Sequence, residues 1–411
     1  MKQLKKSAIA AVVALCMGSL GLGGVSDAAT LSLIQINRTA PGKQFLPIMA
    51  KGFSLTKGKL VGHIAGNSLL SASNSPLNDP YAPLVNGYDD YHYLNGDTFT
   101  SGSYSMLNGY TSAPGPVMMG PRHIYIVWYG NWRGNTAQTI IPRFIQSLNN
   151  SPYENIETSY KIGGVPMSGG ITLNGQAFDN YSYGASITDA DIEMIVKNQI
   201  SKGSLPVDSN GIYVVLTSAD VQETSGFCTS FCGWHSDGLM VGNTDIKYAF
   251  VGNGEACATT PGSWQGACIA MNSNYTAWNS PNNNPGADGM VSVIAHETEE
   301  AATDPEVSSF YTLGFIGWDW FADQSYENGD QCAWRFGGNS RSLFMTNNGS
   351  VANMSLGGAN YLIQKNVVLV DPNGTSDYGI NGVNWWNWYF GGAAAVGGTY
   401  DYCALSEPSA L

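Results

Sequence analysis

The segment "IAHETEEAATDP" at residues 294–305 contains three residues suited to metal chemistry: His296, Glu297 and Glu300. It differs from the His-Glu-x-x-His signature of zinc metalloproteases in having Glu at position 300. Residues four apart lie on one face of a helix, so His296 and Glu300 could bind the same ion. Glu297 has the place of the general base that activates metal-bound water. Because a carboxylate is an acceptable zinc ligand, the pattern predicts a zinc site, with calcium or manganese as alternatives.

The distribution of acids along this segment also favours a cation. Glu297, Glu299, Glu300 and Asp304 crowd the C-terminal half of the expected helix, where the helix dipole disfavours negative charge. Like charges one turn apart, such as Glu300 and Asp304, add repulsion. A bound cation would offset both effects. The alternative is an acidic helix face that is simply solvated.

A third protein ligand is expected downstream of the helix. The segment "SYENGDQC" supplies Glu327 and Asp330, and these two are preferred to His235 and Asp304. The predicted metal ligands are therefore His296 and Glu300 with Asp330 or Glu327, and Glu297 is the predicted catalytic base.

The N-terminus is typical of a secretory signal peptide at residues 1–28. Lys2, Lys5 and Lys6 precede an apolar stretch, and small residues follow. Its removal would change the net charge from −13 to −15, because it takes away the three lysines and one acid, Asp27. Such an acidic chain repels nucleic acid, and no other run is apolar and long enough for a membrane anchor. We therefore expect a secreted protein, extracellular or periplasmic.

Six of the seven cysteines follow the leader, and an even number in an exported chain predicts disulfides. The simplest pairing joins neighbours along the sequence: Cys228 with Cys232, Cys257 with Cys268, and Cys332 with Cys403. The alternative is a zinc site in "CTSFCGWH", formed by Cys228, Cys232 and His235, which an oxidising compartment disfavours.

The remaining sequence predicts two regions. Residues 29–115 are rich in Gly, Ser, Asn, Pro and Tyr, and are interpreted as a loosely structured arm or pro-segment, with ordinary extended surface structure as the alternative. Residues 116–411 alternate between strand and helix patterns. Strands are expected at residues 124–129, 211–218 and 247–252, and helices at 138–148, 188–202 and 289–303. This alternation predicts a loop-rich, disulfide-stapled α/β (α+β) domain.

Several segments together resemble the EXORDIUM, or phosphate-induced protein, family over about residues 115–405. They include "IYIVWYGNW", "GIYVVLTSADV", "GFCTSFCGWH", "YAFVGN", "PGADGMVSVIAHETEEAATDP" and "ENGDQCAW". Plant members of this family are secreted to the cell wall, and the resemblance implies no settled activity. Plant members lack the His-Glu-x-x-Glu residues, whereas this chain, whose leader looks bacterial, has them. The resemblance also implies a zincin-like mixed sheet, with the active-site helix carrying His296.

Two functions from different classes follow from these patterns. The first is a secreted metal-dependent hydrolase, a zinc metalloprotease-like protein acting on an extracellular peptide or cell-wall polymer. The second is a secreted, non-catalytic cell-wall or glycan-binding protein with a structural metal site. A structural calcium site is a further option.

Overall fold

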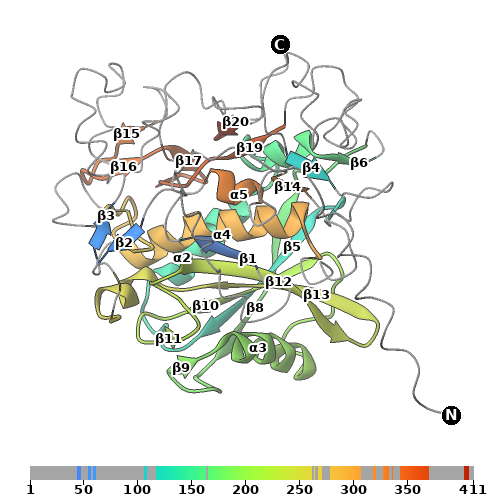
Figure 1. The fold of residues 1–411 in the computed structure, drawn as a ribbon, viewed down its shortest axis with the longest axis horizontal. Helices are drawn as coiled ribbons and strands as arrows, with labels where there is room; N and C mark the ends of the chain where they lie inside the picture. The colour runs from blue at the N-terminus through green and yellow to red at the C-terminus, as the bar shows by residue number, and fades with distance from the viewer. Residues whose placement is uncertain are drawn as a thin grey trace, which may run out of the picture. The chain divides into compact units, whose positions relative to one another are not determined.

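The computed structural model describes residues 44–47, 54–56, 59–61, 106–108, 117–162, 165–261, 263, 267–270, 278–306, 318–320, 327–332, 336, 343–369 and 402–406 (Figure 1). The chain divides into a unit of residues 1–38, none of which is described, and a unit of residues 39–411. The predicted signal peptide and most of the predicted arm therefore lie outside the described residues. The boundaries at residues 28 and 115 stay predictions.

A six-stranded mixed sheet forms the centre of the larger unit, in the order β1-β12-β13-β10-β5-β8. The strands β13, β10, β5 and β8 are parallel neighbours, whereas β12 is antiparallel to both β13 and β1. This sheet and its helices confirm the predicted mixed α+β class. The strand bounds are β1 (Gln44–Pro47), β5 (Arg122–Tyr129), β8 (Ile171–Asp179), β10 (Gly211–Thr217), β12 (Phe231–Val241) and β13 (Thr244–Val251).

Burial of both sheet faces explains the continuous apolar runs of the central strands. All seven residues of β10 are buried. Helix α3 (Asp189–Ser201) packs against β10, β5, β12 and β13, and lies below the sheet in Figure 1. Helix α4 (Pro285–Thr303) contacts β12, β13 and β10 from the other side, together with α2 (Ala137–Leu148), which packs on β8 and α4.

The helix starts follow local capping chemistry. Thr188 and Asp191 form the capping box at the start of α3. Helix α4 begins at Pro285, four residues before its predicted start, because a proline is well tolerated in the first helical position. Asn284 caps this helix by accepting a hydrogen bond from the Ala287 N–H. Asp288, the residue just before the predicted helix, does not cap it. Its carboxylate accepts hydrogen bonds from Ser280 and Asn282.

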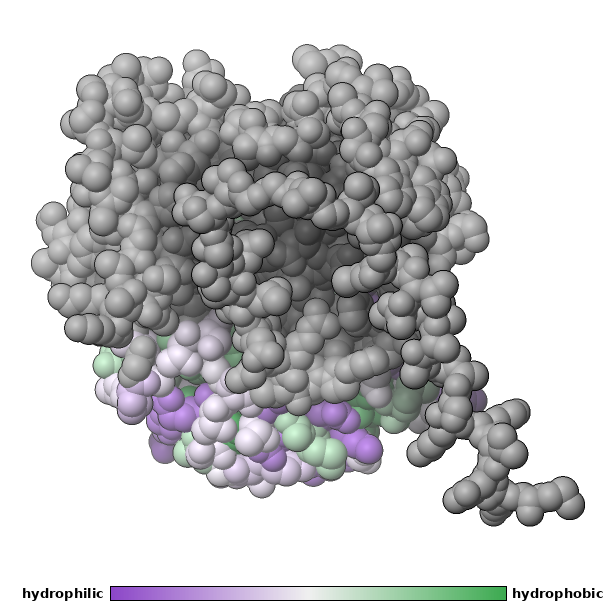
Figure 2. Space-filling view, in the orientation of Figure 1, coloured by the Kyte–Doolittle hydropathy of each residue, from purple (hydrophilic) through white to green (hydrophobic). Residues whose placement is uncertain are grey.

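Shorter elements surround this core. Among the described residues, no helix combines the length and apolar character needed to cross a bilayer. On the described part of the face in Figure 2, hydrophilic and hydrophobic residues are interspersed. The short elements are the 3₁₀ helices η2 (Glu154–Ser159) and η3 (Gly254–Ala258), helix α5 (Asn328–Gln331), and the strand pairs β2 (Ser54–Thr56) with β3 (Lys59–Val61), β4 (Met106–Asn108) with β14 (Trp318–Trp320), β6 (Lys161–Ile162) with β7 (Val165–Pro166), β9 (Ser186–Ile187) with β11 (Gln222–Glu223), β15 (Phe344–Met345) with β16 (Val351–Ala352), β17 (Met354–Leu356) with β18 (Ala359–Tyr361), and β19 (Asn366–Val368) with β20 (Tyr402–Ala404).

The disulfides correct the predicted pairing. Cys228 is bonded to Cys257, and Cys232 is bonded to Cys268. The predicted bonds Cys228–Cys232 and Cys257–Cys268 are wrong, since Cys232 lies within the extended strand β12, whereas Cys228 lies in the loop before it. The two bonds therefore tie β12 and its preceding loop to the segment around η3. They also exclude the alternative zinc site in "CTSFCGWH". Cys332 is disulfide-bonded too, while the side chain of its expected partner, Cys403, lies outside the described residues.

Candidate metal centre

Helix α4 carries the residues of the predicted site into the interior. All of its residues from Gly286 to Thr303 are buried except Gly289, which is partly exposed. His296, Glu297 and Glu300 are each 1% exposed or less. His296 Nε2 lies 2.9 Å from Glu300 Oε1, as expected for residues one helical turn apart. Two potential ligands therefore face each other in a nearly dry environment.

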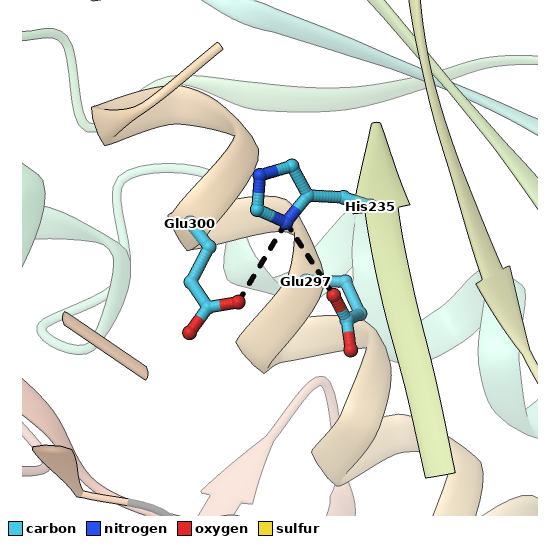
Figure 3. Close-up of side chains that lie close together, drawn as sticks. All are labelled: His235, Glu297 and Glu300. Atoms are coloured by element: carbon cyan, nitrogen blue, oxygen red, sulfur yellow. Dashed lines mark ion pairs between the residues drawn. The ribbon is translucent and has the colours of Figure 1, made fainter. Parts of the chain in front are cut away.

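Strand β12 adds His235 to this group. Its Nδ1 lies 3.6 Å from Glu297 Oε2 and 3.6 Å from Glu300 Oε2, as Figure 3 shows. One ligand atom from each of these three residues lies within 4.8 Å of the other two. Glu300 therefore approaches two imidazoles, using a different carboxylate oxygen for each.

A glycine allows β12 and α4 to pack this closely. A Cβ atom on Gly233 would lie 2.6 Å from Val293 Cγ1 and 2.8 Å from Glu297 Oε1. The sequence ranks His235 behind Glu327 and Asp330, because the third ligand of a zincin-type site often lies beyond the active-site helix. The Gly242-Asn243 pair that turns β12 into β13 is a hairpin signal that could have identified this strand.

The predicted downstream acids have different positions. Glu327 is fully buried, and its Oε1 lies 3.5 Å from His235 Nε2, on the far side of the ring from the α4 carboxylates. The backbone of Asp330 lies in α5, and its side chain lies outside the described residues. Asp304 follows the last turn of α4 and is 3% exposed. Of the preferred third ligands, Glu327 is thus seen to contact the cluster.

Gln364 fixes the other imidazole. Its Nε2 lies 2.6 Å from His296 Nδ1 and donates to the Gly329 carbonyl oxygen at 3.2 Å. Glycine is needed at position 329, since a Cβ there would lie 2.8 Å from both His296 Nδ1 and Glu300 Oε1. Each imidazole therefore has a polar neighbour on the nitrogen away from the Glu300 carboxylate: Glu327 Oε1 for His235 and Gln364 Nε2 for His296.

The electrostatics of the cluster are strongly perturbed. Burial raises the pKa of Glu300, but His296 and His235 outweigh this effect and lower its pKa to about 2. Burial raises the pKa of Glu297 to about 7 despite the opposing effect of His235. Burial lowers the pKa of His235, yet Glu297 and Glu300 raise it on balance to about 10. Without an ion, protonated imidazole supplies the positive charge that these carboxylates require.

The donor atoms fit a divalent cation. Neither carboxylate oxygen of Glu297 and neither ring nitrogen of His235 has a hydrogen-bond partner in the described structure. Buried polar atoms are normally satisfied, so such atoms facing one another indicate a ligand between them. Zinc ligands in a tetrahedron lie roughly 3.3 Å apart at bond lengths of 2.0–2.1 Å. The 3.6 Å separations of His235 Nδ1 from Glu297 Oε2 and Glu300 Oε2 are close to that value. His296 Nε2 lies 2.9 Å from the other oxygen of Glu300.

Glu299 belongs to a different network, on another side of α4. Arg122 forms a buried ion pair with Glu154, next to Glu157 and Glu299. Burial raises the pKa of Glu157 to about 8 and that of Glu299 well above its usual value, and the charge of Glu154 adds to both shifts. The burial of the acid Glu299 therefore depends on a nearby guanidinium and on protonation of the carboxyl groups, and does not require the candidate cation.

Comparison with protein families gives a match over most of this region. The family model described as "Phosphate-induced protein 1 conserved region" matches residues 111–366. That range contains η2, both disulfides and every described member of the cluster. No solved structure matches the chain.

Curated relatives are plant proteins. The chain is 31% identical to Protein EXORDIUM-like 3 of Arabidopsis thaliana over 56% of this chain and 72% of that protein. It is 32% identical to EXORDIUM-like 5 of the same plant, over 48% of this chain and 58% of that protein. Protein PHOSPHATE-INDUCED 1 of Nicotiana tabacum is 28% identical over 48% of this chain and 65% of that protein. The chain thus spans more than half the length of each of these relatives.

Proposed function

The chain belongs to the family defined by the phosphate-induced protein 1 conserved region, and we propose that this member is a secreted metal-dependent hydrolase. It is a zinc metalloprotease-like protein, with a zincin-like His-Glu-x-x-Glu helix in α4 and a leader of bacterial type. The observation that carries this proposal is the buried group of His235, Glu297 and Glu300, whose ligand atoms lie within 4.8 Å of one another. His296 adjoins this group, because its Nε2 lies 2.9 Å from Glu300 Oε1.

His235, His296 and Glu300 are the proposed ligands. Two imidazoles and a carboxylate form a known ligand set of catalytic zinc sites. Glu327 and Gln364 orient the imidazoles from outside this set, at 3.5 Å from His235 Nε2 and 2.6 Å from His296 Nδ1. Asp330 stays a candidate for a further ligand. The acid-rich surroundings also suit calcium or manganese, which metal analysis distinguishes.

Glu297 is the proposed general base. A bound ion would act as a Lewis acid, polarising a carbonyl group and lowering the pKa of coordinated water. The pKa of about 7 places the Glu297 carboxyl close to the optimum for accepting and returning a proton at neutral pH. Glu297 Oε2 lies 3.6 Å from His235 Nδ1, so its carboxylate borders the proposed ion site, and we assign it there as the base.

Complete burial favours a second candidate function. All four residues are 1% exposed or less, and a closed metal site is typical of structural ions. In that case the protein is a secreted, non-catalytic protein that binds cell-wall polymers or glycans, and the ion only stabilises its surface. For the hydrolase, the proposed substrate is an extracellular peptide or cell-wall polymer. The disulfides are compatible with secretion in both cases.

The deciding experiment combines metal analysis with a base substitution. Purified protein is expected to contain about one zinc per chain, lost in His296→Ala/Glu300→Ala. Glu297→Gln should keep the ion and the circular dichroism spectrum but lose at least 100-fold in hydrolysis of casein or a peptide library, because a general base contributes roughly 10²–10⁴-fold. Glu193→Gln, on helix α3, is the matched control.

Three results would contradict parts of this assignment. Loss of the ion in Glu297→Gln would make Glu297 a ligand, in keeping with its place among the three clustered donors. Hydrolysis that survives the substitution would remove its role as base. Bound zinc without hydrolysis of any substrate would favour the structural site.

A further inference from the structure

The candidate centre lies beside one edge of the sheet. Strand β12 pairs with β13 on one side, and its other side is covered only by the four residues of β1 among the described strands. The pairing is antiparallel, with Gln44 opposite His235, Phe45 opposite Trp234 and Pro47 opposite Phe231. Without β1, residues 231–235 of β12 would present an open row of backbone donors and acceptors, which is the usual docking site for an extended peptide.

The place of β1 puts any occupant of this edge next to the centre. Besides pairing with β12, β1 contacts α4 and α5, and Figure 1 shows it between α4 and β12. The residue paired with His235 lies within roughly 5.5 Å of it, measured between Cα atoms. A peptide main chain on the same edge would therefore run past the ligand His235 and along the helix that carries Glu297 and Glu300.

The pairing of β1 is suited to exchange. The strand is short, its register is irregular between Phe45 and Pro47, and Pro47 has no backbone N–H to donate. Few ladder hydrogen bonds therefore hold it. By contrast, β12 and β13 pair over most of their length and lie next to the Cys232–Cys268 bond. Strand β12 is thus held firmly in the sheet, whereas another extended segment could replace β1.

From these observations we infer that the outer edge of β12 binds extended peptides by strand addition, and that β1 occupies this site as an internal blocking segment. The inference rests on the proposed hydrolase function, for which it supplies the substrate class and a form of regulation. The same inference reconciles a buried centre with access for a substrate. A peptide that displaces β1 from β12 would take a place beside α4 and His235. The bound peptide runs antiparallel to β12.

Hydrogen exchange in the full-length chain tests this inference. Phe45→Pro/Leu46→Pro removes two backbone N–H groups from β1, and Leu55→Pro in β2 is the control in another N-terminal strand. We expect amides within residues 231–235 that face β1 to exchange at least tenfold faster in the double variant only. Amides of β10, in the sheet interior, should not change. A synthetic peptide of residues 42–50, added in trans, should restore the protection.

Hydrolysis, measured separately, distinguishes the two proposals. Faster casein cleavage by the double variant, inhibited by the added peptide, supports both. Unchanged exchange at residues 231–235, or no effect of the peptide, overturns strand addition whatever the hydrolysis. Equal cleavage by wild type and double variant overturns the blocking role and leaves the hydrolase intact. The expected exchange without any cleavage overturns the hydrolase and leaves a peptide-binding edge.

Discussion

One methyl group at position 329 should weaken zinc binding at the proposed metal centre more than it destabilises the fold. In Gly329→Ala the new Cβ would lie 2.8 Å from both Glu300 Oε1 and His296 Nδ1. Ordinary van der Waals contact begins at 3.4 Å, so one side must yield by about 0.6 Å. Ligand constellations need to be held within roughly 0.5 Å. We therefore expect zinc affinity to fall about 10–100-fold, as it does when residues that orient the ligands are changed.

A competition titration against a chromophoric chelator measures this loss, and two glycine variants provide the comparison. A Cβ on Gly233 would lie 2.7 Å from the Phe250 carbonyl oxygen, which is fixed in the sheet. Gly233→Ala should therefore also cost about 1–3 kcal/mol of unfolding free energy. Gly120→Ala, whose Cβ meets only Asn210 Nδ2 at 3.9 Å, should change neither property. Wild-type zinc affinity in Gly329→Ala would refute the assigned roles of His296 and Glu300.

Two further predictions concern stability. The raised pKa of Glu157, about 8, means that the folded chain binds more protons than the unfolded chain between pH 4.5 and 8, so its unfolding free energy should decrease as pH rises through this range. Glu157→Gln should flatten that dependence in urea titrations, and an unchanged slope would assign it to other groups. Cys228→Ala/Cys257→Ala removes a crosslink between residues 29 apart. It should lower the unfolding free energy, measured by urea titration, by about 3–4 kcal/mol. A loss below 1 kcal/mol would contradict this.

Local signals were sufficient to predict the regular elements. The capping box of α3 and the buried runs of β5 and β10 determine those elements within a few residues, and the structure contains all three. The one-turn spacing of His296 and Glu300 likewise follows from the helical period alone. These features depend on residues close together in the sequence, where steric and hydrogen-bonding preferences act directly.

Long-range pairings escaped prediction because they depend on topology. His235 lies 61 positions before His296, and only the packing of β12 against α4 brings both imidazoles next to Glu300. The crossed pairing of Cys228 with Cys257 and Cys232 with Cys268 has the same origin. Glu299 illustrates a further limit, since the Arg122–Glu154 ion pair near it comes from β5 and η2 and not from the local sequence.

The charge balance of the cluster leads to a last prediction. The pKa of His235 lies near 10 because Glu297 and Glu300 outweigh its burial, so at pH 7 the ion-free chain holds a proton on this imidazole. An ion binding at Nδ1 must displace that proton. Calorimetry in two buffers of different ionisation enthalpy should therefore detect about one proton released per zinc at pH 7, and affinity should rise about tenfold per pH unit from pH 6 to 8.

A histidine control separates this site from the rest of the chain. His123, which bonds to Asp208 at a partly exposed position, lies outside the cluster, so His123→Gln should release protons on zinc binding as the wild type does. His235→Ala should bind zinc weakly and without this proton release. Zinc binding that is independent of pH in the wild type would show that the imidazole proton and the ion do not compete. The carboxylates of α4 would then need a different source of positive charge, because two buried acids on one helical face cannot both stay ionised without one.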